Sequence, residues 1–299
     1  MHLLSASRRM DLPAFQLEAF LGHARRGWMT VPHPFTGRPQ RIRLVGPEVA
    51  GIVFWTRRPA ALLPHLDELR RLWRDALRVH VTLTGMPREL EPRAPAVAEV
   101  LPALASLAQG LGPRHLSWRF DPLLLSEGTP AEWWVERFEA LAPRLAGHVS
   151  EVMLSWLDLY ARTRRNLLPV EGRGFRLHNP TPAARRDLLD ALAGVARRHG
   201  LTLKACCEPD MLEHSQVLPG ACLDGAWFEQ RRGLVAGALG AAPSRAGCGC
   251  CRSRDVGVYD SCAFGCRYCY ANRRPHETAP ADPWTPHAPG DTLPLAPEW

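Results

Sequence analysis

The chain has 299 residues, of which 46% are hydrophobic, so it carries enough apolar side chains for a large buried core. Its formal charge is +7, but Lys204 is the one lysine among 37 basic residues, which indicates a bias towards arginine more than a nucleic-acid groove. No segment approaches the roughly 18 apolar residues of a membrane span, and the N-terminus lacks the apolar region of a secretory signal. These features exclude a membrane protein, a disordered chain and a secreted disulfide scaffold, and we expect a cytoplasmic protein without a membrane partner.

Short apolar runs rich in β-branched residues alternate with longer helical patterns. We expect strands at His2–Ala6, Gly51–Trp55, Arg78–Leu83, Leu116–Phe120, Glu151–Trp156, Leu201–Cys206 and Val256–Tyr259. Helices are expected at Pro13–Arg26, Ala60–Ala76, Pro95–Leu111, Ala131–Ala146, Pro182–His199 and Ala226–Leu239. The segment Trp28–Leu44 shows no helical pattern and is expected to form a hairpin or an ordered loop.

This alternation is typical of βαβ units and a parallel sheet, so the fold class is α/β. Six or seven such units fit a full or partial (β/α) TIM-type barrel better than an open sheet. We expect one barrel domain over residues 1–276, which includes a cysteine-rich metal-binding segment at 206–272. The remaining residues, 277–299, contain six prolines and are expected to form an extended or disordered tail.

Polar residues lie within or just after the ends of nearly every expected strand, at the edge where barrel enzymes carry their active sites. They are Arg8, Arg9, Thr56, Arg57, Arg119, Asp121, Asp158 and Lys204. Polar strand ends can also simply face solvent. That explanation suits Arg119 and Asp121 less well, because these residues alternate with Trp118 and Phe120 and therefore share one face of a strand. Such a pair is either a structural ion pair or a ligand clamp.

Three cysteines near the C-terminus, Cys262, Cys266 and Cys269, follow one another at intervals of four and three positions. This spacing suits a loop around a metal cluster. Soft thiolate ligands select zinc, copper(I) or iron–sulfur centres. Structural zinc requires four protein ligands, whereas a [4Fe–4S] cluster accepts three cysteines and one further ligand. The triplet therefore favours an iron–sulfur cluster with one iron open to a non-protein ligand.

The other six cysteines suggest a second centre. Cys206, Cys222, Cys248 and Cys250 could supply four thiolates to zinc or to an auxiliary iron–sulfur cluster. Cys207 and Cys251 would then be spare, although each adjoins an expected ligand and could replace it. In the alternative interpretation, Cys206 and Cys207 are small buried hydrophobic residues.

The CxxxCxxC spacing, with Tyr268 before its last cysteine, resembles the signature of the radical S-adenosylmethionine enzymes. The run Cys266-Arg-Tyr-Cys269-Tyr-Ala is similar to the spore photoproduct lyase branch. The resemblance implies a partial (β/α)6 barrel and a [4Fe–4S] cluster whose open iron binds S-adenosylmethionine and whose reduced form cleaves it to a 5′-deoxyadenosyl radical. The triplet of those enzymes follows the first barrel strand, so its C-terminal place here indicates a permuted or divergent arrangement. Their Gly-Gly-Glu motif has no counterpart after the second expected strand.

Under this resemblance the strand-end residues divide into two expected roles. Cofactor binding is expected of Arg8, Arg9, Thr56, Arg57 and Tyr268. Catalytic roles are expected of Arg119, Asp121, Asp158 and Lys204. A reductant such as flavodoxin or ferredoxin would be a partner of such an enzyme.

Over about residues 2–276 the chain resembles a bacterial family called domain of unknown function 1848, which is noted for a C-terminal cysteine cluster of this kind. The matching segments are Ser5–Arg9, Asp11–Phe15, Phe54–Arg57, Thr82–Gly85, Trp118–Pro122, Cys222–Asp224, Asp255–Tyr259 and Cys262–Asn272. The resemblance implies the cofactor and leaves the substrate open.

Three functions follow from these patterns. The first is a radical S-adenosylmethionine-like iron–sulfur enzyme that acts on a small molecule or a nucleic acid. The second is a non-catalytic module in which zinc or an iron–sulfur cluster holds the C-terminal segment. The third is a nucleic-acid repair or modification protein, suggested by the +7 charge and the lyase-like cysteine run.

Overall fold

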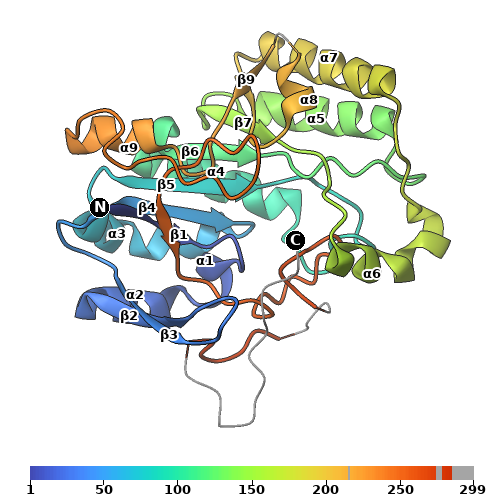
Figure 1. Ribbon diagram of the computed structural model, residues 1–299. Helices are drawn as coiled ribbons and strands as arrows, with labels where there is room; N and C mark the ends of the chain where they lie inside the picture. The colour runs from blue at the N-terminus through green and yellow to red at the C-terminus, as the bar shows by residue number, and fades with distance from the viewer. Residues whose placement is uncertain (215, 274–277, 285–299) are drawn as a thin grey trace.

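The computed structural model describes residues 1–214, 216–273 and 278–284, and its centre is a sheet of eight parallel strands (Figure 1). In sheet order the strands are β10 (Ser253–Asp255), β1 (His2–Ala6), β4 (Val49–Thr56), β5 (Leu77–Thr82), β6 (Leu116–Arg119), β7 (Glu151–Leu154), β8 (Leu203–Ala205) and β9 (Val217–Pro219). The α/β class and the parallel sheet predicted from the sequence are confirmed. Apart from β10, the strands lie in the order in which they occur along the chain.

Six expected strands are confirmed, the first with the same bounds and the others within two residues at each end. The seventh was wrong, because the last strand is Ser253–Asp255 and Val256–Tyr259 follows it as irregular chain. Val256 and Val258 instead place their side chains in the core. Gly257 passes so close to Ser7 that a β-carbon on it would lie 1.9 Å from the Ser7 hydroxyl, which leaves no room for another side chain. The short β9 was not predicted.

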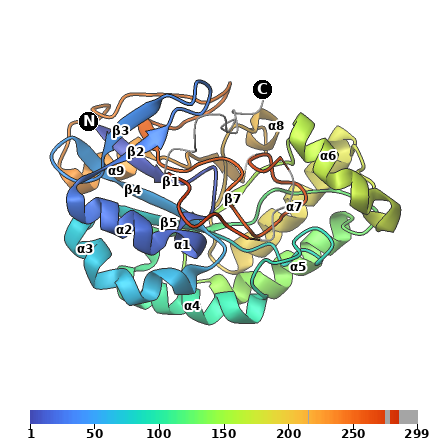
Figure 2. The same cartoon turned by 90° about the horizontal axis from the view of Figure 1, so that it is seen from below.

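Most of the helices cover one face of the sheet, and α9 with the C-terminal segments covers the other (Figure 2). The helices are α1 (Leu12–Phe15), α2 (Leu17–Arg26), α3 (Leu66–Trp73), α4 (Val97–Leu111), α5 (Ala131–Leu145), α6 (Ala161–Val170), α7 (Pro182–Arg198), α8 (Pro209–Leu212) and α9 (Gly225–Arg232). Two 3₁₀ helices, η1 (Pro59–His65) and η2 (Pro113–His115), and one π-helical segment, η3 (Glu171–Phe175), lie between them. None of the described helices is long and apolar enough to cross a membrane.

The expected helices are confirmed with three corrections. The first is interrupted at Gln16, and the second begins as the 3₁₀ turn η1, where Pro64 has no N–H to donate. The helix expected at Ala226–Leu239 ends at Arg232, because Gly233 takes a left-handed conformation (φ 61°) and terminates it. Helix α6 was not predicted. The segment after α2 is an antiparallel hairpin of β2 (Trp28–Pro32) and β3 (Pro39–Arg43), as one of the two expected forms.

The sheet has a different chemistry on its two faces. On the helix-covered face an aromatic group joins β6 to α5: the Trp118 ring stacks on Phe138 with centroids 4.9 Å apart, and Phe120 meets the edge of Trp134. On the opposite face a smaller apolar cluster forms around Leu3, and α9 and the cysteine-rich segment complete it. Alternation along each strand therefore separates a large core from a second layer built by the C-terminal part of the chain.

The ladder of hydrogen bonds does not join β9 to β10 in the part of the chain that the structure describes. Residues 220–252, which include α9, connect these two strands. The sheet thus has two edges, and the C-terminal cysteine-rich segment begins at one of them. Of the expected tail, the described residues 278–284 pack on the domain, where the Trp284 indole donates to the Val256 carbonyl at 2.7 Å, and the rest lies outside the described residues.

Replacement of Trp118 tests the helix-covered core. Trp118 is fully buried, and its indole N–H donates to the Leu83 carbonyl at 2.8 Å. We expect Trp118→Ala to lower the free energy of unfolding by about 3–5 kcal/mol, because it leaves a cavity and an unpaired carbonyl. Urea denaturation measures this change. The matched control is Leu168→Ala, which alters an exposed side chain and should change stability by no more than about 0.5 kcal/mol; equal losses in both variants would contradict the described packing.

Candidate functional site

A cavity of about 820 Å³ lies at the carboxyl ends of the parallel strands and is bordered by both cysteine groups. The structure brings nearly all the predicted site residues together around it. These residues are Arg8, Arg9, Thr56, Arg57, Arg119, Asp121, Asp158, Tyr268, Cys206, Cys222, Cys248, Cys250, Cys262, Cys266 and Cys269. The strand-end rule therefore led to one shared site, because all carboxyl ends of a parallel sheet lie at the same edge.

Lys204 is the predicted site residue that does not line this cavity. Its ammonium nitrogen lies 2.7 Å from a carboxylate oxygen of Glu151, at the amino end of β7. Glu151 also pairs with the buried guanidinium of Arg78, and these two cations hold the pKa of the Glu151 carboxyl below its ordinary value against the effect of burial. Lys204 thus extends away from the carboxyl ends of the strands and neutralises a buried acid.

The loop that carries the cysteine triplet is held by hydrogen bonds from side chains and backbone to backbone carbonyl groups. The Asn272 amide donates to the Cys262 carbonyl at 2.8 Å, and Asn166 of α6 donates to the Asn272 carbonyl at 2.9 Å. The backbone N–H of Arg267 donates to the Leu90 carbonyl at 2.9 Å. The triplet is therefore anchored from both sides before any metal binds.

Two of the predicted cofactor-binding residues, Arg57 and Tyr268, meet a buried acid that sequence reasoning missed. A guanidinium nitrogen of Arg57 lies 3.0 Å from the Glu91 carboxylate and donates to the Tyr268 hydroxyl, which donates to Glu91. The Thr84 hydroxyl adds a donor to Glu91 at 2.7 Å. Burial raises the pKa of Tyr268 well above its ordinary value, so the hydroxyl keeps its proton. Glu91 belongs to no recognisable pattern, because its partners are distant in sequence.

The triplet thiols are half-buried and neutral in the metal-free protein. Burial raises the pKa of Cys262 and Cys269, and that of Cys266 to about 12 although Arg57 opposes the change. The backbone N–H of Ala271 points to the Cys269 sulfur at 3.3 Å. Thiols in this setting need a cationic centre in order to ionise, and a metal cluster supplies one.

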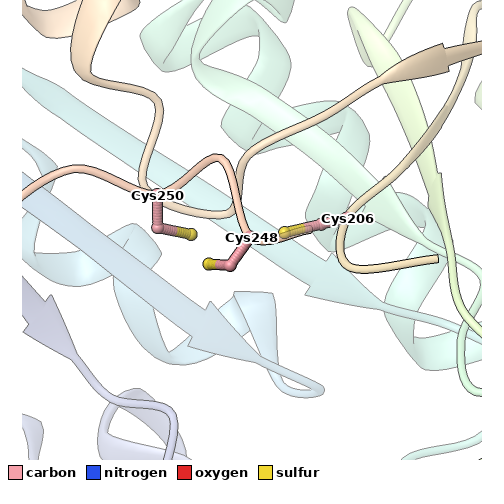
Figure 3. A group of neighbouring side chains, drawn as sticks. All are labelled: Cys206, Cys248 and Cys250. Carbon is pink, nitrogen blue, oxygen red and sulfur yellow. The ribbon is translucent and has the colours of Figure 1, made fainter. Parts of the chain in front are cut away.

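The second cysteine group could hold a metal ion. The sulfur atoms of Cys206, Cys248 and Cys250 all lie within 4.8 Å of one another (Figure 3). The fourth predicted ligand, Cys222, lies outside this close group, although its thiol interacts with those of Cys206 and Cys250. Of the two cysteines expected to be spare, Cys207 has its sulfur 3.6 Å from that of Cys206, and Cys251 lies in the apolar cluster beneath the site.

Local hydrogen bonds favour ionisation of two thiols in this second group, Cys248 and Cys222, while the pKa values of Cys206 and Cys250 are raised. Burial opposes ionisation of Cys248, but donors from the backbone and hydroxyl of Ser244 outweigh it and lower the pKa of this thiol to about 6. Hydrogen bonds from the Cys206 and Cys250 thiols lower the pKa of Cys222 well below its ordinary value. Thiolates are the form that binds a soft metal ion.

Ion pairs form the charged wall of the cavity. Arg119 and Asp121 bind each other, with Nε 2.9 Å from one carboxylate oxygen, and the Ser155 hydroxyl donates to Asp121 at 3.3 Å. Asp158 pairs with Arg245, which was not predicted as a site residue. The structural ion pair considered for Arg119 and Asp121 is therefore present, and it faces the cavity where a ligand could exchange with either partner.

The remaining predicted residues lie beside two buried carboxylates. Arg8 approaches Asp255 to 3.7 Å, while Arg9 donates to the Gly257 carbonyl at 3.1 Å. Thr56 lies next to Asp11, whose carboxylate caps α1 by accepting from Ala14 at 3.0 Å. Asp255 was missed because it precedes the run that had been assigned to a strand.

Glu91→Gln tests the buried network behind the triplet. Without the Glu91 charge, the buried guanidinium of Arg57 loses the carboxylate that it pairs with directly, so we expect the free energy of unfolding to fall by about 3–5 kcal/mol. We also expect faster alkylation of Cys262, Cys266 and Cys269 in the metal-free protein, followed by mass spectrometry. The exposed neighbour gives the control Glu89→Gln, which should change neither quantity; unchanged stability of Glu91→Gln would show that the network is not formed.

Asp11 makes stability depend on pH. Burial raises the pKa of this carboxyl from 3.8 to about 6, so the folded protein binds the proton more tightly than the unfolded chain. That stabilisation is complete below about pH 4 and is lost as the pH rises through 6. Asp11→Asn keeps the capping acceptor but has no proton to release. As the pH rises from 4 to 7, we therefore expect the free energy of unfolding of wild type to fall by up to about 3 kcal/mol relative to that of Asp11→Asn, measured by urea denaturation of metal-free protein. Exposed Asp67 supplies the control Asp67→Asn, and parallel pH profiles for Asp11→Asn and wild type would refute the expectation.

Comparison with known proteins identifies the family to which most of the chain belongs. Neither the curated proteins nor the solved structures gave a significant match. One family model, described as Domain of unknown function (DUF1848), matches residues 3–271, which include the sheet except for His2, the cavity and both cysteine groups. The chain belongs to the DUF1848 family.

Proposed function

We propose that the protein is a radical S-adenosylmethionine-like iron–sulfur enzyme, in which Cys262, Cys266 and Cys269 hold a [4Fe–4S] cluster. The observation that carries the proposal is that all three thiols open into the cavity at the carboxyl ends of the parallel strands. This is where barrel folds perform their chemistry. A metal that only fastened the C-terminal segment would need no cavity of this size beside it.

The donor set fits such a cluster. Three thiolates come from one anchored loop, and Arg57 interacts electrostatically with Cys266 and Cys269, which offsets the negative charge of a thiolate-bound cluster. The Ala271 N–H beside the Cys269 sulfur is a further stabilising donor. When bound and reduced, the cluster supplies the electron that cleaves S-adenosylmethionine, and a flavodoxin or ferredoxin would supply that electron to it.

The strand order supports a permuted partial barrel. The order is sequential from β1 to β9, as in a barrel, and the cysteine loop follows β10, an edge strand beside β1. In an open barrel with sequential order the first strand is also an edge strand. The triplet thus comes last in the sequence while it takes the spatial place of a loop that follows a first strand.

The cavity residues suit a charged cofactor and its substrate. A volume of about 820 Å³ is within the range of cofactor sites, about 300–1,000 Å³. Arg8, Arg9 and Arg119 can bind carboxylate or phosphate oxygens, and Asp121 and Asp158 can accept from an amino group. Because Arg119 and Asp121 already neutralise each other, a bound ligand would exchange with one partner of an existing pair.

Anaerobic reconstitution tests the proposal. We expect about four irons and four sulfides to bind at the triplet, an electron paramagnetic resonance signal after reduction, and release of 5′-deoxyadenosine from S-adenosylmethionine under a strong reductant. Cys262→Ser, Cys266→Ser and Cys269→Ser should each lose this iron and the 5′-deoxyadenosine. Cys251→Ser, outside both groups, is the control. Iron binding that is equal in wild type and Cys262→Ser would refute the cluster, and a bound cluster without 5′-deoxyadenosine would refute the enzyme.

A further inference from the structure

The second cysteine group lies where the hydrogen-bonded sheet is interrupted. In the described chain β9 and β10 form the two ends of the strand order. Cys206 directly follows β8, Cys222 comes shortly after β9, and Cys248 and Cys250 come shortly before β10. The four thiols therefore belong to three chain segments that border the interruption. Those of Cys206, Cys248 and Cys250 converge on one point (Figure 3).

We propose that Cys206, Cys222, Cys248 and Cys250 bind a single tetrahedral zinc ion that fastens the sheet between β9 and β10. The inference concerns a site separate from the triplet, and it stands whether or not the triplet holds an iron–sulfur cluster. In this proposal the metal at the second cysteine group is zinc, and its role is to stabilise the fold.

The spacing of the sulfur atoms favours one ion over a cluster. Zinc–sulfur bonds of about 2.3 Å in a tetrahedron place the sulfurs about 3.8 Å apart. The sulfurs of Cys206, Cys248 and Cys250 all lie within 4.8 Å of one another. The thiol of Cys222 interacts with those of Cys206 and Cys250, which makes it the fourth ligand of the proposed ion. A four-iron cluster takes one thiolate on each iron, so it holds its ligands farther apart. Four thiolates without an open position are the ligand set of structural zinc.

The surroundings also suit a bound tetrathiolate ion. The Ser244 hydroxyl donates to the Cys248 sulfur at 3.5 Å, and buried His80 places Nε2 2.8 Å from the Cys222 carbonyl oxygen, to which it donates. Such outer contacts orient metal ligands. Zinc with four thiolates carries a net charge of −2, and Arg8 and Arg119 both interact electrostatically with Cys222. These two guanidinium groups, each of which also pairs with a carboxylate, thus lie near the proposed dianionic centre.

The proposed ion replaces the missing strand pairing. The ends of the segment between β9 and β10 are joined by few backbone bonds, among them Cys251 N–H to the Leu223 carbonyl at 3.0 Å. A metal bound by residues after β8, after β9 and before β10 would cross-link all three segments. Since the triplet loop follows β10, the same ion would also hold that loop at the cavity. Structural zinc stabilises folds in this way.

Metal analysis and X-ray absorption of the full-length protein test the site. We expect one zinc per chain and a shell of four sulfurs at about 2.3 Å. Cys222→Ser and Cys250→Ser should retain zinc more than about tenfold less tightly against a chelator, because even changes outside the ligand shell cost about 10–100-fold. Cys207→Ser and Cys251→Ser, which replace neighbouring cysteines, are matched controls and should keep the wild-type metal content.

Several outcomes would overturn the proposal. These are iron and sulfide at this group in place of zinc, a zinc shell with fewer than four sulfurs, or loss of zinc from Cys207→Ser as large as that from Cys222→Ser. The spectrum of the wild-type protein decides the ligand set even if a variant fails to fold. Cys262→Ser should lose iron and keep zinc, so failure of the iron–sulfur proposal and failure of the zinc proposal give different results.

Discussion

The buried carboxylate of Asp255 is the interaction on which the arrangement of the site depends. It accepts from the hydroxyls of Ser5 and Ser7 and from the backbone of Arg8 and Gly257, at 2.5–3.0 Å. Burial of a carboxylate is costly unless donors and cations surround it, and here they do, so the pKa of Asp255 stays below its ordinary value. The end of the last strand is thereby bound to the end of the first, and the cysteine triplet that follows is delivered to the cavity.

One face of the sheet packs in the main core, and the other carries the polar side chains of the site. The cause is that successive side chains of a strand point to opposite faces. In β5, Val79 and Val81 face the helices, while Arg78, His80 and Thr82 alternate with them. Polar side chains at the amino ends of the strands pair among themselves, as Arg78 does with Glu151. Those at the carboxyl ends surround the cavity with its two cysteine groups. The protein can therefore place both cysteine groups against one pocket without disturbing its main core.

The sequence predicted the place of a site residue where that place follows from the pattern of its own strand. It did not predict the place where a partner far away in the sequence determines the direction of the side chain. Arg119 ends β6 and Asp121 follows it, and the pattern of that strand predicted both their common face and their place at the cavity. Lys204 also follows the pattern, but the acid at the start of β7 draws its side chain away from the cavity. Glu91 gave no signal, because its role comes from contacts with Arg57 and Tyr268, which are 34 and 177 residues away along the chain.

By itself the sequence determined the α/β class, six of the strands, most of the helices and the grouping of the last three cysteines, because each of these depends on residues within a few positions of one another. The tertiary structure decided that β10 lies beside β1, that β9 and β10 leave the ladder interrupted, and that Cys206, Cys248 and Cys250 converge there. These features arise from packing between segments far apart in the chain. A local pattern carries no record of which distant segment will become a neighbour.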